Sequence, residues 1–227
     1  MRRLAVLFAA LSLIAAPALA ADAAHPSVIE LFQSQGCSSC PPANENVMAL
    51  ADRPDLLVLS FAVTYWDRLG WKDRFAKPEF TQRQYAYRDG LKHDNVWTPQ
   101  TVINGRVDVT GIRAAELGRA VTGGARTDAT PSLTEKAGRI DLGAGTGKAD
   151  VWLVRYDPRI VQVPVRAGEN AGRTLPHRNV VHDLVKLGAW TGSAAHWARP
   201  AATPGLADAV LVQRPGGGPI LTVLRLR

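Results

Sequence analysis

Two apolar stretches early in the chain predict buried strands separated by a helix. Residues 28–32 form a short apolar run, and residues 56–63 are almost continuously apolar, as expected for parallel strands covered on both faces. Between them, residues 43–51 repeat apolar side chains at helical spacing, and Pro54 follows soon after. A strand, a helix and a strand of these lengths indicate a right-handed crossover.

The pattern that follows predicts a hairpin and a closing helix. Residues 101–103 and 106–109 flank Asn104-Gly105, and an Asn-Gly pair is the strongest short-range signal for a hairpin. Residues 112–121 then have the pattern of a helix that Gly123 can cap. Residues 26–124 therefore run in the order strand, helix, strand, insertion, hairpin and helix, which is the order of a thioredoxin-like α/β domain.

The insertion, residues 64–97, is rich in aromatic and charged residues. It contains a predicted helix at residues 79–91, opened by Pro78. The loop before this helix follows the carboxyl end of a parallel strand, where ligands of open α/β sheets bind. Four side chains of this loop are therefore candidates for the wall of a substrate groove: Trp66, Asp67, Trp71 and Asp73. The alternative is that the tryptophans pack in the core and the aspartates cap or solvate the loop.

The second half of the chain begins with a change of pattern. Residues 124–131 are a linker candidate. Residues 150–156 and 160–166 flank an Asp-Pro-Arg turn, and residues 209–214 and 219–226 flank three glycines. Both pairs predict antiparallel hairpins.

One further segment of this half is ambiguous by pattern. Residues 179–190 fit a helix by the spacing of their apolar positions and a strand by their β-branched content, and we predict a strand. With the two hairpins, residues 125–227 are expected to form a small, mainly antiparallel, sandwich-like β domain.

The start of the chain has the features of a secretory signal peptide. Arg2 and Arg3 precede an apolar stretch, and Ala18-Leu19-Ala20 has the small-x-small form of a signal-peptidase site. The apolar stretch is shorter than the ~20 residues that a membrane-spanning helix needs. We therefore predict a signal peptide at residues 1–20, cleavage after Ala20, and a periplasmic or secreted protein. An uncleaved membrane anchor is the alternative.

Charge changes this picture only slightly. The formal charge of +7 at pH 7 falls to +5 without Arg2 and Arg3, and the basic residues are scattered, with no run of five like charges. This pattern argues against nucleic-acid binding. No later segment is long and apolar enough to span a bilayer. We therefore expect no nucleic-acid partner and no stable membrane insertion after cleavage.

The candidate chemistry lies in Cys37 and Cys40, the two cysteines of the chain. Thiol–disulfide exchange needs one accessible thiolate and a second thiol close enough to resolve the mixed disulfide, and a Cys-Ser-Ser-Cys motif at a strand-to-helix turn supplies both. Cys37 is the predicted attacking thiol and Cys40 the resolving thiol. Pro41 and Pro42 remove two amide donors, so we expect the helix to begin only at Pro42.

Two other interpretations of the motif remain open. An inert structural disulfide would close a loop of only four residues and contribute roughly 2 kcal/mol. A metal site would need two further ligands, and the available histidines have no ligand spacing: His25, His93, His177, His182 and His196. Haem attachment is excluded, because Pro41 stands where a histidine is needed. We expect neither a metal nor an organic cofactor.

Thr98-Pro99 precedes the predicted hairpin and is the second candidate element. In thioredoxin-like proteins a cis-proline stands at this place in the order, beside the dithiol, and the backbone of the preceding residue pairs with a substrate peptide. Thr98-Pro99 is similar to that element. An ordinary trans-proline at a strand entry is the alternative, since only about 5% of X-Pro bonds are cis in folded proteins.

Several of these segments resemble one bacterial family over nearly the whole mature chain. They are Glu30-Leu31-Phe32 with Cys37-Ser38-Ser39-Cys40-Pro41-Pro42, Tyr65-Trp66-Asp67 with Leu69-Gly70-Trp71-Lys72-Asp73, Thr98-Pro99-Gln100, and Gly168-Glu169-Asn170-Ala171-Gly172-Arg173-Thr174 with His177-Arg178-Asn179-Val180-Val181. Together they are similar to the secreted thioredoxin-like family catalogued as domain of unknown function 1223. The resemblance implies a thioredoxin-like domain with an appended β domain, and no established substrate.

One polar segment of the β half forms a possible secondary site. The segment carries more polar side chains than a β-sandwich usually has: Glu169, Asn170, Arg173, His177 and Asn179. Turn hydrogen bonding and a salt bridge would explain them. The sharper hypothesis is that this segment packs over the dithiol.

The motif favours one function over two others. The first hypothesis is an exported thiol–disulfide oxidoreductase that acts on exported protein or small-molecule thiols and disulfides, with a possible redox partner protein. The second is a non-enzymatic binding or scaffold protein with an inert disulfide, since fold alone does not fix function. The third is delivery of copper or zinc by Cys37, Cys40 and a histidine.

Overall fold

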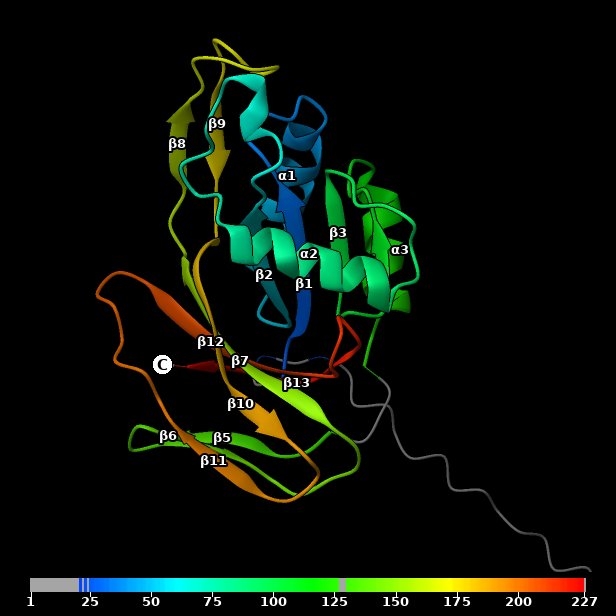
Figure 1. The fold of residues 1–227 in the computed structure, drawn as a ribbon, viewed down its shortest axis with the longest axis vertical. Coiled ribbons are helices and arrows are strands. Elements are labelled where there is room, and N and C mark those ends of the chain that lie inside the picture. The colour runs from blue at the N-terminus through cyan, green and yellow to red at the C-terminus, as the bar shows by residue number, and fades with distance from the viewer. Residues whose placement is uncertain (1–20, 22, 24, 127–129, 227) are drawn as a thin grey trace, which may run out of the picture.

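The described residues of the computed structural model, 21, 23, 25–126 and 130–226, form an eight-stranded sheet flanked by three helices and two smaller sheets. Figure 1 shows the arrangement. In the first half the elements are β1 Ser27–Gln33, α1 Cys40–Met48, β2 Leu56–Ala62, η1 Asp67–Leu69, α2 Pro78–Gly90, β3 Gln100–Ile103, β4 Val107–Val109 and α3 Ala114–Gly123. In the second half they are β5 Leu133–Lys136, β6 Arg139–Leu142, β7 Ala149–Asp157, β8 Val161–Pro164, β9 Thr174–His177, β10 Val180–Trp190, β11 Ala195–Ala198, β12 Ala207–Gln213 and β13 Ile220–Leu226.

The strands of the first half follow the predicted pattern. β1 and β2 are parallel, and every residue of both strands is buried. β3 runs antiparallel to β1 and forms a hairpin with β4, in which Asn104 and Gly105 take positive φ angles of 49° and 62°. The Asn-Gly pair is suited to this turn because both central positions require left-handed backbone. The predicted strands and hairpin are confirmed.

The helices cover both faces of this part of the sheet. Ala43 and Val47 of α1 pack with Leu117 of α3 against one face of β1 and β2. Phe80 and Tyr87 of α2 pack on the opposite face, where the rings of Phe61 of β2 and Phe80 meet edge-on at 5.4 Å. Because helices cover both faces of the sheet here, the sequences of β1 and β2 are almost continuously apolar. Within the described residues, no helix has the length and apolar character needed to cross a membrane.

The strands of the second half continue the same sheet. Its order is β13-β12-β7-β10-β2-β1-β3-β4, and β10 joins β2 where Val180 pairs with Ser60. Asn179 strengthens this junction, since its side-chain amide donates to the Val58 carbonyl at 2.9 Å and its own carbonyl accepts from the Ser60 amide at 2.9 Å. The core beneath α2 also takes side chains from both halves, including Leu211. The sheet and the core thus both continue across residue 124, the predicted boundary between the two domains.

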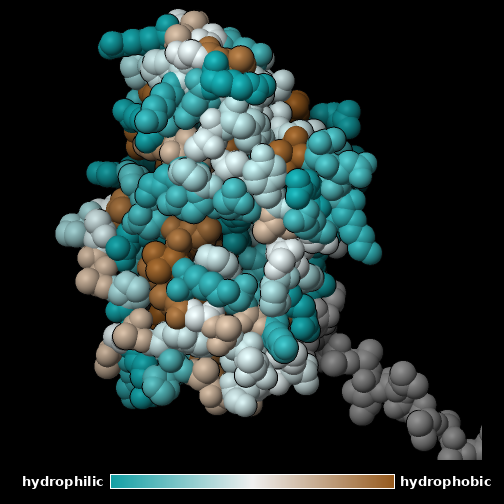
Figure 2. Space-filling view, in the orientation of Figure 1, coloured by the Kyte–Doolittle hydropathy of each residue, from teal (hydrophilic) through white to brown (hydrophobic). Residues whose placement is uncertain are grey.

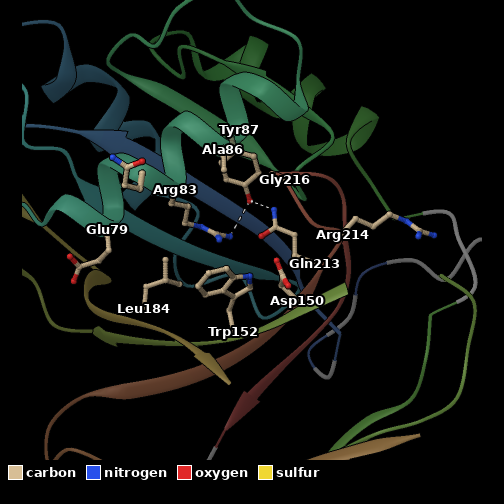
Figure 3. Close-up of a pocket in the computed structure, with 12 residues that line it drawn as sticks. Glu79, Arg83, Ala86, Tyr87, Asp150, Trp152, Leu184, Gln213, Arg214 and Gly216 are labelled. Atoms are coloured by element: carbon tan, nitrogen blue, oxygen red, sulfur yellow. Dashed lines mark hydrogen bonds between the residues drawn. The ribbon is translucent and has the colours of Figure 1, made fainter. Parts of the chain in front are cut away.

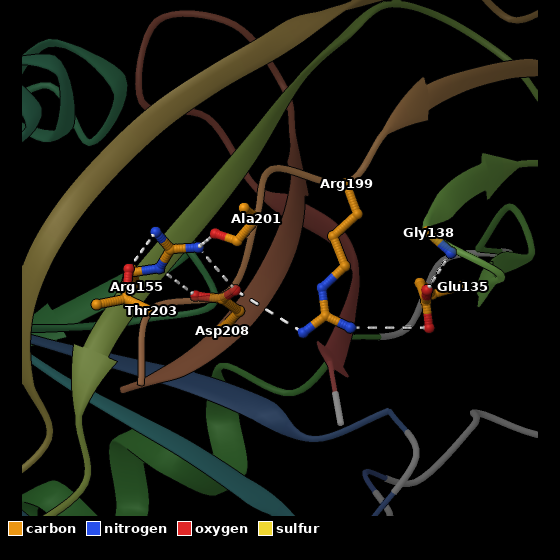
Figure 4. Close-up of polar contacts among 7 residues, drawn as sticks. All are labelled: Glu135, Gly138, Arg155, Arg199, Ala201, Thr203 and Asp208. Atoms are coloured by element: carbon orange, nitrogen blue, oxygen red, sulfur yellow. Dashed lines mark hydrogen bonds and ion pairs between the residues drawn. The ribbon is translucent and has the colours of Figure 1, made fainter. Parts of the chain in front are cut away.

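A second layer covers the far end of this sheet. The three-stranded sheet β11-β6-β5 packs Ile140 and Leu142 against Val151, Val210 and other side chains of the long sheet. Figure 4 shows an ionic network that joins the two layers. Arg155 of β7 pairs with Asp208 of β12 at 2.8 Å, and Arg199, which follows β11, lies 3.8 Å from Asp208 and 3.9 Å from Glu135 of β5.

The predicted hairpin between residues 150–156 and 160–166 is wrong. β7 pairs with β10 on one side and β12 on the other, so neither of its edges is free for β8. At the turn, Asp157 accepts from the backbone amide of Arg159 at 3.0 Å and redirects the chain. β8 pairs with β9 instead.

Other predictions in the second half have mixed outcomes. The hairpin of β12 and β13 and the strand at residues 179–190 are confirmed. Part of the candidate linker, residues 127–129, and the predicted signal peptide, residues 1–20, lie outside the described residues.

Candidate active site

Cys37 lies in the tight turn between β1 and α1. Its backbone amide donates to the Ser34 carbonyl at 3.1 Å, and the Cys40 amide donates to the Cys37 carbonyl at 3.2 Å. α1 begins at Cys40, so the prediction of a start at Pro42 is wrong. Prolines are tolerated in the first helical turn because the amides they lack have no partner within the helix. The helix N-terminus therefore lies directly at the motif.

The two thiols have opposite electrostatic environments. Both are free and only 1% exposed. A hydrogen bond from the Cys40 side chain lowers the pKa of Cys37 to about 7, with further support from the Thr98 side chain and nearby backbone amides, against the opposing effect of burial. Burial raises the pKa of Cys40 well above its usual value, and neighbouring Cys37 raises it further. This asymmetry suits Cys37 to attack and Cys40 to resolve.

Thr98 and Pro99 lie beside the dithiol. The Thr98-Pro99 peptide bond is cis, as predicted, and the Cys37 thiol contacts the Thr98 carbonyl with the sulfur 3.9 Å from the oxygen. Trp66 fixes the Thr98 side chain, since the indole Nε1 donates to Thr98 Oγ1 at 2.7 Å. The carbonyl that precedes the proline therefore faces the sulfur of Cys37.

The loop of the insertion supports the turn from one side. Trp71 Nε1 donates to Gln35 Oε1 at 2.9 Å, and Asp73 accepts from the Gln35 backbone amide at 2.8 Å. Asp67 in turn accepts from the Asp73 amide at 3.1 Å. Burial raises the pKa of Asp73 to about 6. The four predicted loop residues thus gather at the motif, and their polar atoms hold the site rather than pointing freely into a groove.

Residues 168–173, here called the strap, support the turn from the other side. The Glu169 carboxylate accepts from the backbone amide of Ser38 at 2.9 Å and from its hydroxyl at 2.7 Å. Asn170 is fully buried, and its amide donates to the carbonyls of Gln35 at 3.0 Å and Cys37 at 2.8 Å. Arg173 donates to Asn170 Oδ1 at 2.8 Å. Three residues of the predicted segment, Glu169, Asn170 and Arg173, thus pack against the turn that carries the dithiol motif.

His177 lies apart from the strap, on β9, and lines a cavity of about 490 Å³ together with Cys40. It is 4% exposed, and the Phe75 ring packs edge-on against it at 5.9 Å. Burial lowers the pKa of His177 to about 4, with a smaller contribution from Arg74. The ring is therefore neutral at physiological pH.

Sequence reasoning missed the polar residues just before the motif. Gln33, Ser34 and Gln35 are buried at the end of β1 although the strand itself is apolar. Gln33 bonds to Asn44 Oδ1 at 3.1 Å and to Ser60 Oγ at 2.6 Å. The signal available in the sequence was three consecutive polar residues at the carboxyl end of a buried parallel strand, where sites of α/β sheets form.

A second cavity, of about 360 Å³, lies away from the dithiol between α2 and strands β7 and β10. Figure 3 shows Trp152 and Leu184 on one side of it and Arg83 and Tyr87 of α2 on the other. In Figure 2, apolar surface is gathered below α2 in this region. Its buried polar groups are paired, with Arg83 bound to Glu30 at 2.6 Å.

The described part of the chain contains no cluster of side chains that could bind a metal ion. No three His, Cys, Asp or Glu side chains gather there in a way that could hold an ion. Cys37 and Cys40, two of the side chains considered as metal ligands, contact each other, but no third ligand joins them among the described residues.

Comparison with known proteins places the chain in a family. The family model described as protein of unknown function (DUF1223) matches residues 28–213. The chain belongs to the DUF1223 family. A crystal structure of protein AGR_C_4864 from Agrobacterium tumefaciens is 34% identical, with a TM-score of 0.73 over 88% of this chain and 93% of that one. HBP35 of Porphyromonas gingivalis is 12% identical, with a TM-score of 0.57 over 89% of this chain and 75% of that one, and shares the fold alone. No curated protein matches.

Proposed function

We propose that this DUF1223 protein is an exported thiol–disulfide oxidoreductase with a thioredoxin-like arrangement around the dithiol. Support for the fold comes from the order β1, α1, β2, α2, β3, β4 and α3 and from a cis-proline beside the motif. Support for export comes from the signal-like residues 1–20.

The proposed reaction has two exchanges. The Cys37 thiolate attacks one sulfur of a substrate disulfide, forming a mixed disulfide, and the other substrate sulfur leaves as a thiolate that takes up a proton. Cys40 then loses its proton and attacks Cys37, so that the Cys37–Cys40 disulfide forms and the second substrate thiolate leaves. The substrate is reduced by two electrons and the protein is oxidised; the reverse sequence oxidises a dithiol.

One arrangement carries this proposal: two free thiols lie at the N-terminus of α1, the Cys37 sulfur is 3.9 Å from the Thr98 carbonyl oxygen, and this asymmetric environment lowers the pKa of Cys37 while burial raises that of Cys40. A structural disulfide has no need of such an asymmetry, whereas exchange needs one thiolate near neutral pH. Because Cys37 is 1% exposed, a substrate reaches it only when a covering group moves. Within the strap, the exposed contacts of Glu169 with Ser38 are the ones suited to that movement, whereas buried Asn170 stays bound to the turn.

The test is the redox equilibrium of the mature protein in glutathione buffers, with both thiols alkylated and counted by mass. A potential near −200 mV or above with rapid exchange supports catalysis, and one below about −300 mV with slow exchange marks a structural bond. Cys40→Ser should trap mixed disulfides with exported proteins, and Cys37→Ser should trap none. Full cellular activity of a protein lacking both cysteines would instead favour a binding function.

A further inference from the structure

The cavity beside Cys40 contains a buried histidine that the proposed exchange does not yet use. Its wall includes Cys40, Ser34, Gln33, Asn44, Glu45 and His177. Asn44, one helical turn after Cys40, donates to the Pro176 carbonyl at 2.7 Å and so fixes β9 against the Cys40 face of α1. This contact sets His177 into the same cavity as the resolving thiol.

The imidazole of His177 has no strong hydrogen bond. Its Nε2 is buried and finds no partner within the described residues. Its Nδ1 lies 3.4 Å from Gln33 Nε2, whose two hydrogens point to Asn44 Oδ1 and Ser60 Oγ. Buried polar atoms are nearly always paired, so an unpartnered nitrogen on a residue that lines a cavity calls for an explanation. At about 490 Å³ the cavity has room for water, which occupies roughly 30 Å³ per molecule.

The resolving step needs a proton acceptor at this place. Cys40 is a thiol when the mixed disulfide forms, and only its thiolate attacks Cys37. We propose that His177, through the water of this cavity, accepts the proton that Cys40 releases as it resolves the mixed disulfide. The inference rests on the proposed function. The S–S bond between Cys37 and Cys40 forms, the bond from Cys37 to the substrate breaks, and the proton passes from Nε2 to solvent.

The electrostatics of the cavity fit this role. His177 is neutral and therefore has a lone pair to accept with. A proton on the ring forms close to the new Cys40 thiolate, whose negative charge stabilises it. The other charged or titratable groups that face the two residues are Glu45, Arg74, Arg173, Arg178, Cys37 and Tyr65. Glu45 is the competing acceptor among them, because it is a carboxylate on the same wall.

The experiment separates the two exchanges in a single turnover. Reduced mature protein is mixed with the aromatic disulfide dithiobis(nitrobenzoate), and release of coloured thiol is followed by stopped flow. Attack by Cys37 releases the first equivalent and resolution by Cys40 the second. His177→Phe keeps an aromatic ring of similar size against Phe75 but cannot accept a proton. Glu45→Gln is the matched control from the same cavity wall.

At pH 7, His177→Phe should slow the second release about 10²-fold or more and leave the first unchanged, since general-base effects are about 10²–10⁴-fold. The two proteins should converge at high pH, where Cys40 ionises unaided. In His177→Ala, added imidazole should restore the second release, because the truncation leaves room for it. Glu45→Gln should match the parent.

Three results would overturn the inference. The first is an equal rate of second release in the parent and His177→Phe at all pH values, and the second is a slower second release in Glu45→Gln instead. The third is a slower second release in the His177 variants that is constant with pH and not relieved by imidazole. Each leaves the proposed function standing if the parent shows both releases. Absence of a rapid first release in the parent would instead contradict the proposed function itself. Circular dichroism of each variant confirms that the chain is folded.

Discussion

The two sides of the dithiol differ in how their buried polar groups are satisfied. On the Cys37 side, the amide of Asn170 meets two carbonyls of the turn, and Arg173 meets its oxygen. On the Cys40 side, a cavity leaves Nε2 of His177 with no partner in the described part of the chain. A hydrogen-bond network in which every group is paired fixes the geometry of the turn. A nitrogen without a partner remains available to accept a proton. The first side is built to hold the motif, and the second is suited to move a proton.

The largest expected effect, on the free energy of unfolding, comes from removing the Asn170 hydrogen bonds on the Cys37 side. Asn170→Ala leaves the buried carbonyls of Gln35 and Cys37 without donors. At about 1–3 kcal/mol for each stranded acceptor, we expect a loss of about 4 kcal/mol in the free energy of unfolding. Urea denaturation measures it. Asn46→Ala is the control, since Asn46 also donates to two carbonyls, at 3.0 and 2.8 Å, but in a partly exposed place where water can substitute. Equal losses in both variants would contradict the comparison.

Two buried titratable groups near the motif, His177 and Asp73, should respond oppositely to acid. Burial holds the pKa of His177 at about 4 against an ordinary 6.5, so the stability due to its neutral ring is present above pH 6.5 and lost as pH falls toward 4. Burial raises the pKa of Asp73 from 3.8 to about 6, so its contribution is present below pH 3.8 and lost as pH rises through 6. At about 1.4 kcal/mol per pH unit, each effect approaches about 3 kcal/mol.

Two variants separate these contributions. When the pH falls from 7 to 4, His177→Phe should lose less free energy of unfolding than the parent. Asp73→Asn should gain less free energy of unfolding than the parent, or lose more. Urea denaturation at the two pH values gives both differences. If the two variants shift the pH dependence in the same direction, the assignment of opposite roles to the two groups is wrong.

Thiol alkylation tests the asymmetry between the cysteines directly. Iodoacetamide should modify Cys37 with a rate that rises through pH 7, while Cys40 stays unmodified until well above pH 9. Cys40→Ala removes the largest cause of the lowered pKa and should move the Cys37 midpoint upward. Mass spectrometry of the peptides identifies which thiol reacts. Similar profiles for both cysteines would remove the main support for exchange.

The smallest expected effect concerns the exposed end of the strap. Glu169→Gln removes a negative charge beside Ser38 and weakens the contact that holds the strap to the turn. We expect Cys37 to be alkylated a few-fold faster, because its thiolate loses a repulsive neighbour and its cover is looser. Glu45→Gln, on α1, is the control and should leave the rate unchanged. An unchanged rate in Glu169→Gln as well would mean that the strap does not limit access.

Local patterns predicted most of the first half. The apolar runs of β1 and β2, the Asn-Gly turn after β3 and the proline at the start of α2 each act within a few residues, so spacing and residue type were sufficient. The failed hairpin shows the limit. Residues 160–166 alternate as a strand should, but pairing depends on which edges are free, and β7 had both edges taken by β10 and β12. Alternation predicts a strand without naming its partner.

Local sequence was sufficient to predict the elements around the motif: two cysteines separated by two residues, a strand before them, a helix after them, and a proline beside them. Their environment depends on contacts between distant parts of the chain. Glu169 and Asn170 reach Ser38 and Cys37 from more than 130 positions along the chain, and Asn170 itself shows no periodic signal of this role. His177 shares a cavity with Cys40 because β9 packs against α1. Burial and hydrogen bonding shift the pKa of a group through neighbours that are close in space, and the order of residues does not record which neighbours those are.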